Sequence, residues 1–186
     1  MRGYIDNNRD RILWITRTAS FIALLIVSQA ATAPLGNQFV TGSIVNFLLI
    51  VSVMTCGLTS GFTVSILSHI MAKFFGIGPL WSLVPFVAAG NIVLVVIWYF
   101  IGNRSAGGRY MNYAAALVLA ALGKFLTLYA GIVKIAVPIL LDLPERQASV
   151  ISFMFSFPQI ITASIGGVMA CILLPVLEKT VFAAKE

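Results

Sequence analysis

The sequence predicts an all-α integral membrane protein: a single domain, residues 1–186, formed by a bundle of six transmembrane helices. Two observations carry this prediction. Of the residues, 60% are hydrophobic and only 10% are charged, whereas a soluble domain carries about 25% charged residues. The apolar residues also gather in long runs, and a helix needs about 17–25 mainly apolar residues to cross a bilayer.

Six runs reach or approach that length, and no repeat or low-complexity segment separates them. The second and third are short, and the Gly-rich string "CGLTSGF" between them predicts a tight turn that joins them as a helical hairpin. The expected helices are Ile12–Thr32, Gly42–Gly57, Gly61–Phe75, Leu80–Gly102, Met111–Ile139 and Val150–Leu177.

The first run has an alternative interpretation. "FIALLIVSQAATAP" resembles the apolar part of a signal peptide, with Ala31-Thr32-Ala33 as a cleavage site. The preceding segment, however, is long and contains Asp6 and Asp10, and Pro34 would follow the cut directly. We therefore expect a retained first helix.

Basic residues predict the orientation of the bundle. Six spans place both termini on one side, and positive residues favour the cytoplasm. The opposite side holds only Arg146, so both termini are predicted to be cytoplasmic. The terminal side holds eight basic residues: Arg2, Arg9, Arg11, Arg17, Arg104, Arg109, Lys179 and Lys185.

Proline positions predict an irregular outer half. Proline cannot donate a backbone hydrogen bond and frees a carbonyl in the preceding turn. Non-helical backbone at membrane depth is tolerated where it is buried in protein or lines a cavity. Most prolines fall in the external connections or the outward halves of helices, so we expect a cavity there: Pro34, Pro79, Pro85, Pro138, Pro144 and Pro158.

Polar and aromatic side chains from several spans converge on the same outer region. Ionisable residues at membrane depth are rare and usually face the protein interior, which makes a functional site the first hypothesis. The predicted substrate-binding residues are Gln38, His69, Lys73, Trp81, Asn91, Lys124, Tyr129, Phe157 and Gln159, and the first loop adds Asn37 and Thr41.

Several of these residues have a plainer interpretation. Lys73, like Lys134, lies near a helix end and can extend its ammonium to the interface. Trp81 can be an interfacial aromatic anchor, and His69 can simply bond between helices. Lys124 lies too deep for such an extension, which favours a pocket or a polar helix contact.

The sequence lacks the residues of an energised or catalytic protein. No Asp or Glu lies within the helical interiors that could relay protons, and no phosphate-binding loop of the G-x-x-x-x-G-K-[ST] type is present. No metal-ligand cluster or nucleophile motif occurs either, and Cys56 and Cys171 lie in apolar runs as packing residues. No basic run suggests nucleic acid. We therefore expect a binding protein that is not an enzyme, needs no cofactor and draws energy from a partner.

Small residues indicate where that partner binds. Ala19 and Ala23 form an A-x-x-x-A pair on the first helix, and small residues four apart allow backbones to approach closely in lipid. A similar set in "ASIGGVMAC", Ala163, Gly167 and Cys171, is assigned to internal packing.

Taken with the local strings "RTASFIALLI", "LGNQFVTGSIVNFLLI" and "FGIGPLWSLVPFVAAGNIVLV", these features resemble the S components of energy-coupling factor (ECF) vitamin transporters. The resemblance covers nearly the whole chain. It implies a multi-pass protein of a bacterial plasma membrane that captures a vitamin from outside. Such a protein docks on a coupling transmembrane subunit and two ATPase subunits, and Ala19 and Ala23 match the docking motif.

The subgroup looks most like components assigned to hydroxymethylpyrimidine or B6 vitamers. A small aromatic ring would stack on Trp81, Tyr129 or Phe157, while Asn91 and Gln159 bind its polar atoms. Unpaired lysines at depth favour an anion instead, so pantothenate is the main alternative ligand. The alternative functions are a self-sufficient secondary carrier or channel and, third, a membrane enzyme or a purely structural subunit.

Overall fold

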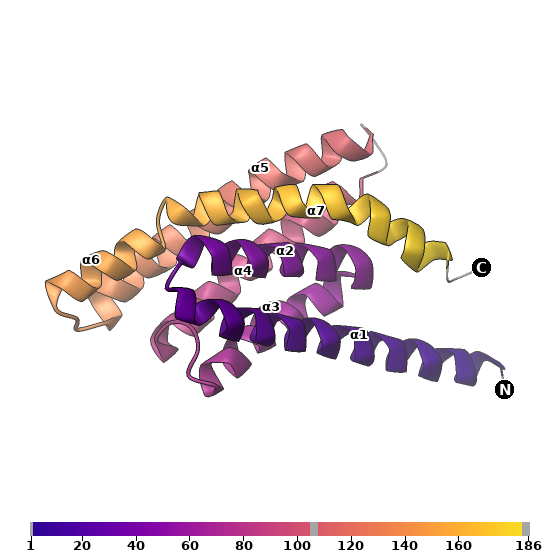
Figure 1. The fold of residues 1–186 in the computed structure, drawn as a ribbon, viewed down its shortest axis with the longest axis horizontal. Helices are drawn as coiled ribbons and strands as arrows, with labels where there is room; N and C mark the ends of the chain where they lie inside the picture. The colour runs from indigo at the N-terminus through magenta and orange to yellow at the C-terminus, as the bar shows by residue number, and fades with distance from the viewer. Residues whose placement is uncertain (1, 105–107, 184–186) are drawn as a thin grey trace.

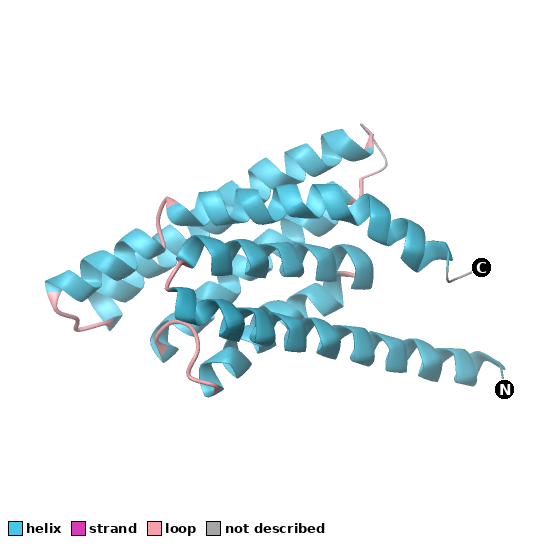
Figure 2. Cartoon of the chain, in the orientation of Figure 1, coloured by secondary structure: helices cyan, strands magenta, loops and turns pink. Residues whose placement is uncertain are grey.

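The chain forms helices joined by short turns, as Figure 2 shows. The computed structural model describes residues 2–104 and 108–183, and no strand occurs among them. The predicted all-α fold is therefore confirmed for this part of the chain.

Three helices make up the first part of the bundle: α1 (Arg2–Thr32), α2 (Gln38–Cys56) and α3 (Leu58–Phe74). Of these, α2 and α3 form the helical hairpin. A short 3-10 turn, η1 (Ala33–Leu35), follows α1, and the Asn37 side chain accepts a hydrogen bond from the amide of Phe39 at the start of α2. That contact satisfies one of the amides that a helix start leaves unpaired.

The second part contains two long helices that change their hydrogen-bonding pattern along their length. The first runs through η2 (Trp81–Leu83), α4 (Val84–Ile97) and the π-helical η3 (Trp98–Gly102). The second runs through α5 (Arg109–Leu128) and the π-helical η4 (Tyr129–Leu140). The chain ends with α6 (Glu145–Met154) and α7 (Pro158–Ala183).

The turn between α2 and α3 is shorter than the sequence predicts. It consists of Gly57 alone, whose φ of 88° is open to glycine without strain. Gly61 lies inside α3, where an added Cβ would stand 2.8 Å from the Cβ of Val53. Its missing side chain therefore serves the close packing of the two helices rather than the turn.

The predicted last helix, Val150–Leu177, is wrong as a continuous element. The chain leaves the helix after Met154 and starts α7 at Pro158. Proline disfavours the helical conformation in the residue before it, yet fits the first turn of a helix because no amide hydrogen is needed there. The break therefore lies where Pro158 requires it.

Among the described residues, five helical stretches of 19 to 33 residues are long and apolar enough to cross a membrane. The last of them, Glu145–Leu177, includes the break between α6 and α7. The one predicted span outside this set corresponds to α3, which has 17 residues and is about 26 Å long. Large apolar side chains are exposed along most helices, among them Ile12, Val27, Phe100 and Ile172. A soluble monomer rarely exposes so much apolar surface, so these faces suit lipid.

Both ends of the chain lie at one end of the bundle, together with the first turns of α5 (Figure 1). The connections from α1 to α2 and from α3 to α4, and the α6–α7 break, lie at the other end. This arrangement divides the molecule into a terminal end and an opposite end where three of the helix connections meet.

Close packing between α2 and α7 fixes the middle of the bundle. A Cβ added to Gly166 would lie 2.7 Å from the backbone oxygen of Ser43 and 2.8 Å from the backbone nitrogen of Phe47. Gly167 stands against Leu117, and Ala163 belongs to the main cluster of buried apolar side chains. The prediction that "ASIGGVMAC" packs internally is confirmed.

We predict that Gly166→Val lowers the free energy of unfolding by about 2–3 kcal/mol, because backbone atoms of α2 cannot yield to a larger residue. The measurement is thermal unfolding of the purified protein in detergent. Ser164→Ala, a small change two residues away on the same helix, is the control and should leave the Tm unchanged. Equal Tm values for Gly166→Val and the wild type would contradict the packing described.

Candidate functional site: a polar cavity at the end opposite the termini

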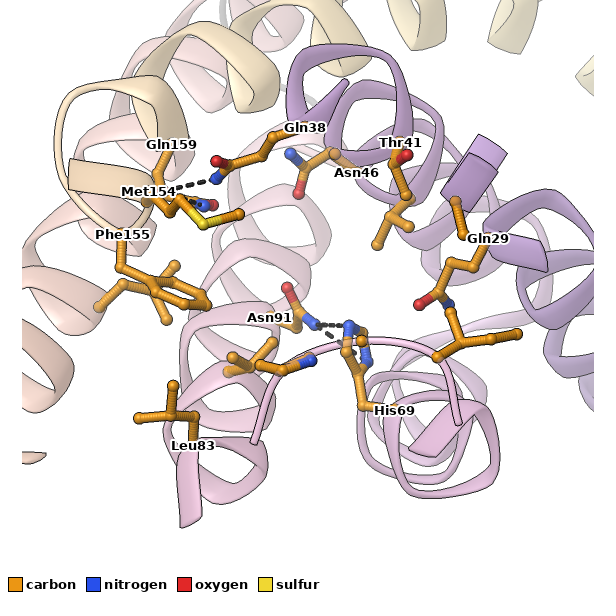
Figure 3. A pocket seen from close by; sticks show the side chains of 18 of the residues that line it. Gln29, Gln38, Thr41, Asn46, His69, Leu83, Asn91, Met154, Phe155 and Gln159 are labelled. Atoms are coloured by element: carbon orange, nitrogen blue, oxygen red, sulfur yellow. Dashed lines mark hydrogen bonds between the residues drawn. The ribbon is translucent and has the colours of Figure 1, made fainter. Parts of the chain in front are cut away.

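A cavity of about 530 Å³ lies at the end opposite the termini. Its wall combines the end of α1, the start of α2, the α3–α4 connection, α4, α5 and the α6–α7 break. Figure 3 shows many of its side chains. The polar residues that line it are Gln29, Thr32, Asn37, Gln38, Thr41, Asn46, His69, Asn91, Lys124 and Gln159.

Lys124 forms the centre of the polar side of the cavity. Its side chain is only 4% exposed. The ammonium donates to Oδ1 of Asn46 at 2.5 Å and to Oδ1 of Asn91 at 2.6 Å. Hydrogen bonds from a charged donor are about twice as strong as neutral ones, so Lys124 fixes the orientation of both amides.

A series of hydrogen bonds leads from Asn91 to α3, and each group in it donates to the next. The Ser68 hydroxyl donates its single hydrogen to the carbonyl of Val64, so its oxygen must accept from Nδ1 of His69, 3.1 Å away. Nδ2 of Asn91 lies 3.3 Å from both ring nitrogens of His69 (Figure 3). Because Nδ1 carries the hydrogen that Ser68 accepts, Nε2 is the nitrogen left to accept from Asn91. This arrangement assigns His69 as the neutral tautomer with hydrogen on Nδ1.

A second series of donors runs from Asn46 to α7. Nδ2 of Asn46 donates to Oγ1 of Thr162 at 3.3 Å, and the Thr162 hydroxyl donates to the carbonyl of Gln159 at 3.2 Å. Asn46, Asn91 and Thr162 are at most 1% exposed. One ammonium therefore connects α2, α3, α4, α5 and α7.

No carboxylate balances this ammonium in the part of the chain that the structure describes. The residues that line the cavity include no Asp or Glu, and the sequence has none between Asp10 and Asp142. No set of three His, Cys, Asp or Glu side chains that could hold a metal ion occurs among the described residues. The site thus offers hydrogen-bond donors and one positive charge.

The α6–α7 break contributes to the cavity through its backbone. The carbonyl of Met154 accepts from Nε2 of Gln38 at 2.5 Å and from Nε2 of Gln159 at 3.0 Å. A carbonyl freed at a helix end must find such partners at membrane depth. The two glutamines therefore hold the break closed against the start of α2.

The rest of the wall is apolar. Leu83, Val87 and Leu128 belong to a second cluster of buried apolar side chains, against which Phe155 packs. Phe155 is the one aromatic residue among those that line the cavity. Ligand pockets commonly combine such an apolar wall with a few placed polar groups.

The structure brings five of the nine predicted substrate-binding residues to the cavity and also includes Asn37 and Thr41 of the first loop. Their role in binding stays a prediction. The five are Gln38, His69, Asn91, Lys124 and Gln159.

The other four predicted residues lie outside the cavity wall. Trp81 is 51% exposed and packs edge-on against Phe74, and Phe157 is 63% exposed. Tyr129 lies beside Phe125 and below the ammonium of Lys134. Lys73 is half-buried near the end of α3. The expected aromatic stack on Trp81, Tyr129 or Phe157 is thus not formed at this cavity.

Sequence reasoning missed two amides of the cavity, Asn46 and Gln29. Both interrupt apolar runs, in "IVNFLL" and "IVSQAA", and an amide inside a membrane span was the signal that could have found them. Gln29 is 5% exposed, and its Nε2 has no hydrogen-bond partner among the described residues.

The predicted docking residues lie elsewhere on the molecule. Ala19 and Ala23 are both exposed on α1, whereas Thr18 on the same helix is buried and hydrogen-bonds with Ser60 of α3 at 2.8 Å. The A-x-x-x-A pair is thus available to a partner outside the described bundle.

Comparisons of the chain with protein-family models, with curated proteins and with solved structures give no match.

We predict that Asn91→Leu lowers the free energy of unfolding by about 1.5–3 kcal/mol, because it removes an acceptor of a charged donor and a partner of His69. For a chain of this size the Tm should fall by about 3–12 °C. Asn103→Leu, at an exposed asparagine that bonds only within its own helix turn, is the control. An unchanged Tm for Asn91→Leu would contradict the network.

Proposed function

We propose that this protein is the substrate-binding membrane subunit of an importer of the energy-coupling factor type. The observation that carries the proposal is the cavity built around Lys124. Polar groups from six helices, α1 to α5 and α7, line it at one end of an apolar helical bundle, and no group of three His, Cys, Asp or Glu side chains that could hold a metal ion occurs among the described residues. A membrane protein with such a site suits capture of a small molecule.

The arrangement of the ends supports an outward-facing cavity. The six-span topology with cytoplasmic termini, which the basic residues favour, would place the opposite end outside the cell. The cavity lies at that end, next to the connections that the prolines interrupt. The protein would then capture its substrate at the outer surface of a bacterial plasma membrane.

The exposed pair Ala19 and Ala23 supports docking on a coupling subunit. Small residues let a second helix approach closely in lipid, and the exposure of both alanines leaves this face free on the described bundle. The coupling transmembrane subunit and two ATPase subunits would supply the energy that this sequence shows no means of providing.

The substrate we propose is a vitamin or vitamin precursor. Hydroxymethylpyrimidine and pyridoxine-like molecules follow from the sequence resemblance, and pantothenate is the alternative that a free cation favours. A cavity of about 530 Å³ lies in the range of about 300–1,000 Å³ that small-molecule sites occupy.

Docking is tested by Ala19→Trp. The bulky side chain should abolish co-purification with the coupling and ATPase subunits, while native mass spectrometry still finds a small molecule bound to the isolated variant. Leu24→Trp, at an exposed residue on another face of α1, is the matched control and should co-purify normally.

Two results would contradict this function. One is normal assembly and vitamin uptake with Ala19→Trp. The other is accumulation of a vitamin by sealed vesicles that contain this chain alone and are driven by an ion gradient, which would favour the self-sufficient carrier.

A further inference from the structure

Lys124 and Gln29 each have a hydrogen in the cavity wall for which the described residues supply no acceptor. An ammonium has three hydrogens, and Lys124 donates to two oxygens, those of Asn46 and Asn91. The other donor is the amide nitrogen of Gln29, which is buried and has no partner. Both residues line the same cavity.

Gln29 is not placed there to stabilise the fold. A buried donor without an acceptor lowers stability. The hydroxyls of Thr32 and Thr41 donate their own hydrogens to the backbone of α1 and to Thr32, and among the described residues no oxygen accepts from the Gln29 amide. Figure 3 shows the Gln29 side chain turned toward the space that faces His69 and Asn91. Its amide is thus positioned to donate to a molecule in the cavity.

The charge of the cavity wall has one sign. Lys124 is the only Lys or Arg among the residues that line the cavity, and none of them is acidic. His69 adds no charge, because its two ring nitrogens are a donor to Ser68 and an acceptor from Asn91. A buried charge is costly unless it is paired, so a bound molecule with one negative group would complete the site.

We propose that the cavity selects a small monoanion of the carboxylate class that carries a second hydrogen-bond acceptor. This inference rests on the proposed binding function and narrows its substrate class: it favours an acid such as the pantothenate alternative over hydroxymethylpyrimidine and the pyridoxine-like molecules. The negative group accepts from Lys124, the second acceptor accepts from the Gln29 amide, and the body of the molecule contacts Leu83, Val87 and Leu128. Cationic molecules are rejected by the ammonium, and neutral ones leave its charge unbalanced.

The test uses the full chain in lipid nanodiscs, freed of bound molecules and incubated with the small-molecule fraction of yeast extract. Retained molecules are released and identified by mass spectrometry in both ion modes. We expect the wild type to retain an anion. Titration with that acid and with its primary amide should show binding of the acid at least about tenfold tighter, as expected for one charge-assisted contact.

Lys124→Met should abolish retention of the anion and the preference for the acid over the amide. Lys134→Met makes the same chemical change at an exposed residue outside the cavity wall, and it should retain the anion as the wild type does. This pair separates a charge in the cavity from the general effect of losing a lysine.

Gln29→Met provides a test that does not disturb the Lys124 network. Because it removes an unpaired buried donor, the variant should unfold at a Tm equal to or above that of the wild type. Its affinity for the retained anion should nevertheless fall about tenfold. Unchanged affinity, or a loss of affinity that parallels a loss of stability, would overturn the role of Gln29.

The remaining outcomes separate the inference from the function on which it rests. A retained neutral or cationic molecule, or equal retention of the anion by Lys124→Met, would overturn the monoanion class and leave the binding function standing. Retention of no molecule by the wild type would overturn both.

Discussion

The structure depends on one buried ammonium. A positive charge away from water must find acceptors, and Lys124 finds them in the side-chain oxygens of Asn46 and Asn91. The nitrogen of each amide then faces away from Lys124: that of Asn46 toward Thr162 on α7, and that of Asn91 toward His69 on α3. A single donor thus sets the direction of the side-chain hydrogen bonds that connect five helices. The series through Asn91 ends on the backbone carbonyl of Val64, and the series through Asn46 ends on that of Gln159.

The cavity lies at the end of the bundle where several helices are interrupted. The break before Pro158, the 3-10 turn after α1 and the α3–α4 connection all lie there. Open backbone at membrane depth needs partners or a polar space. The Met154 carbonyl has its partners in two glutamine amides. In the middle of the bundle, close contacts such as Gly166 against α2 leave the helices packed.

Binding and docking fall on different parts of the molecule in the proposed function. The donors face inward at the end opposite the termini, whereas Ala19 and Ala23 face outward on α1. Such a separation would let one surface engage a shared energising complex while the cavity alone sets the choice of substrate. The unpaired donors of Lys124 and Gln29 are the features on which that choice would depend.

The sequence by itself determined the helical class, the approximate spans and the end at which polar groups gather, because hydropathy and proline positions act locally along the chain. It also identified Lys124, His69 and Asn91, since polar residues in apolar runs need internal partners. Only the tertiary structure decided that Phe155 lines the cavity while Trp81, Tyr129 and Phe157 do not, that Asn46 binds the lysine, and that Gln29 has no partner. Those outcomes depend on helix rotation and on the break at Pro158, which are set by contacts between distant segments that no local pattern records.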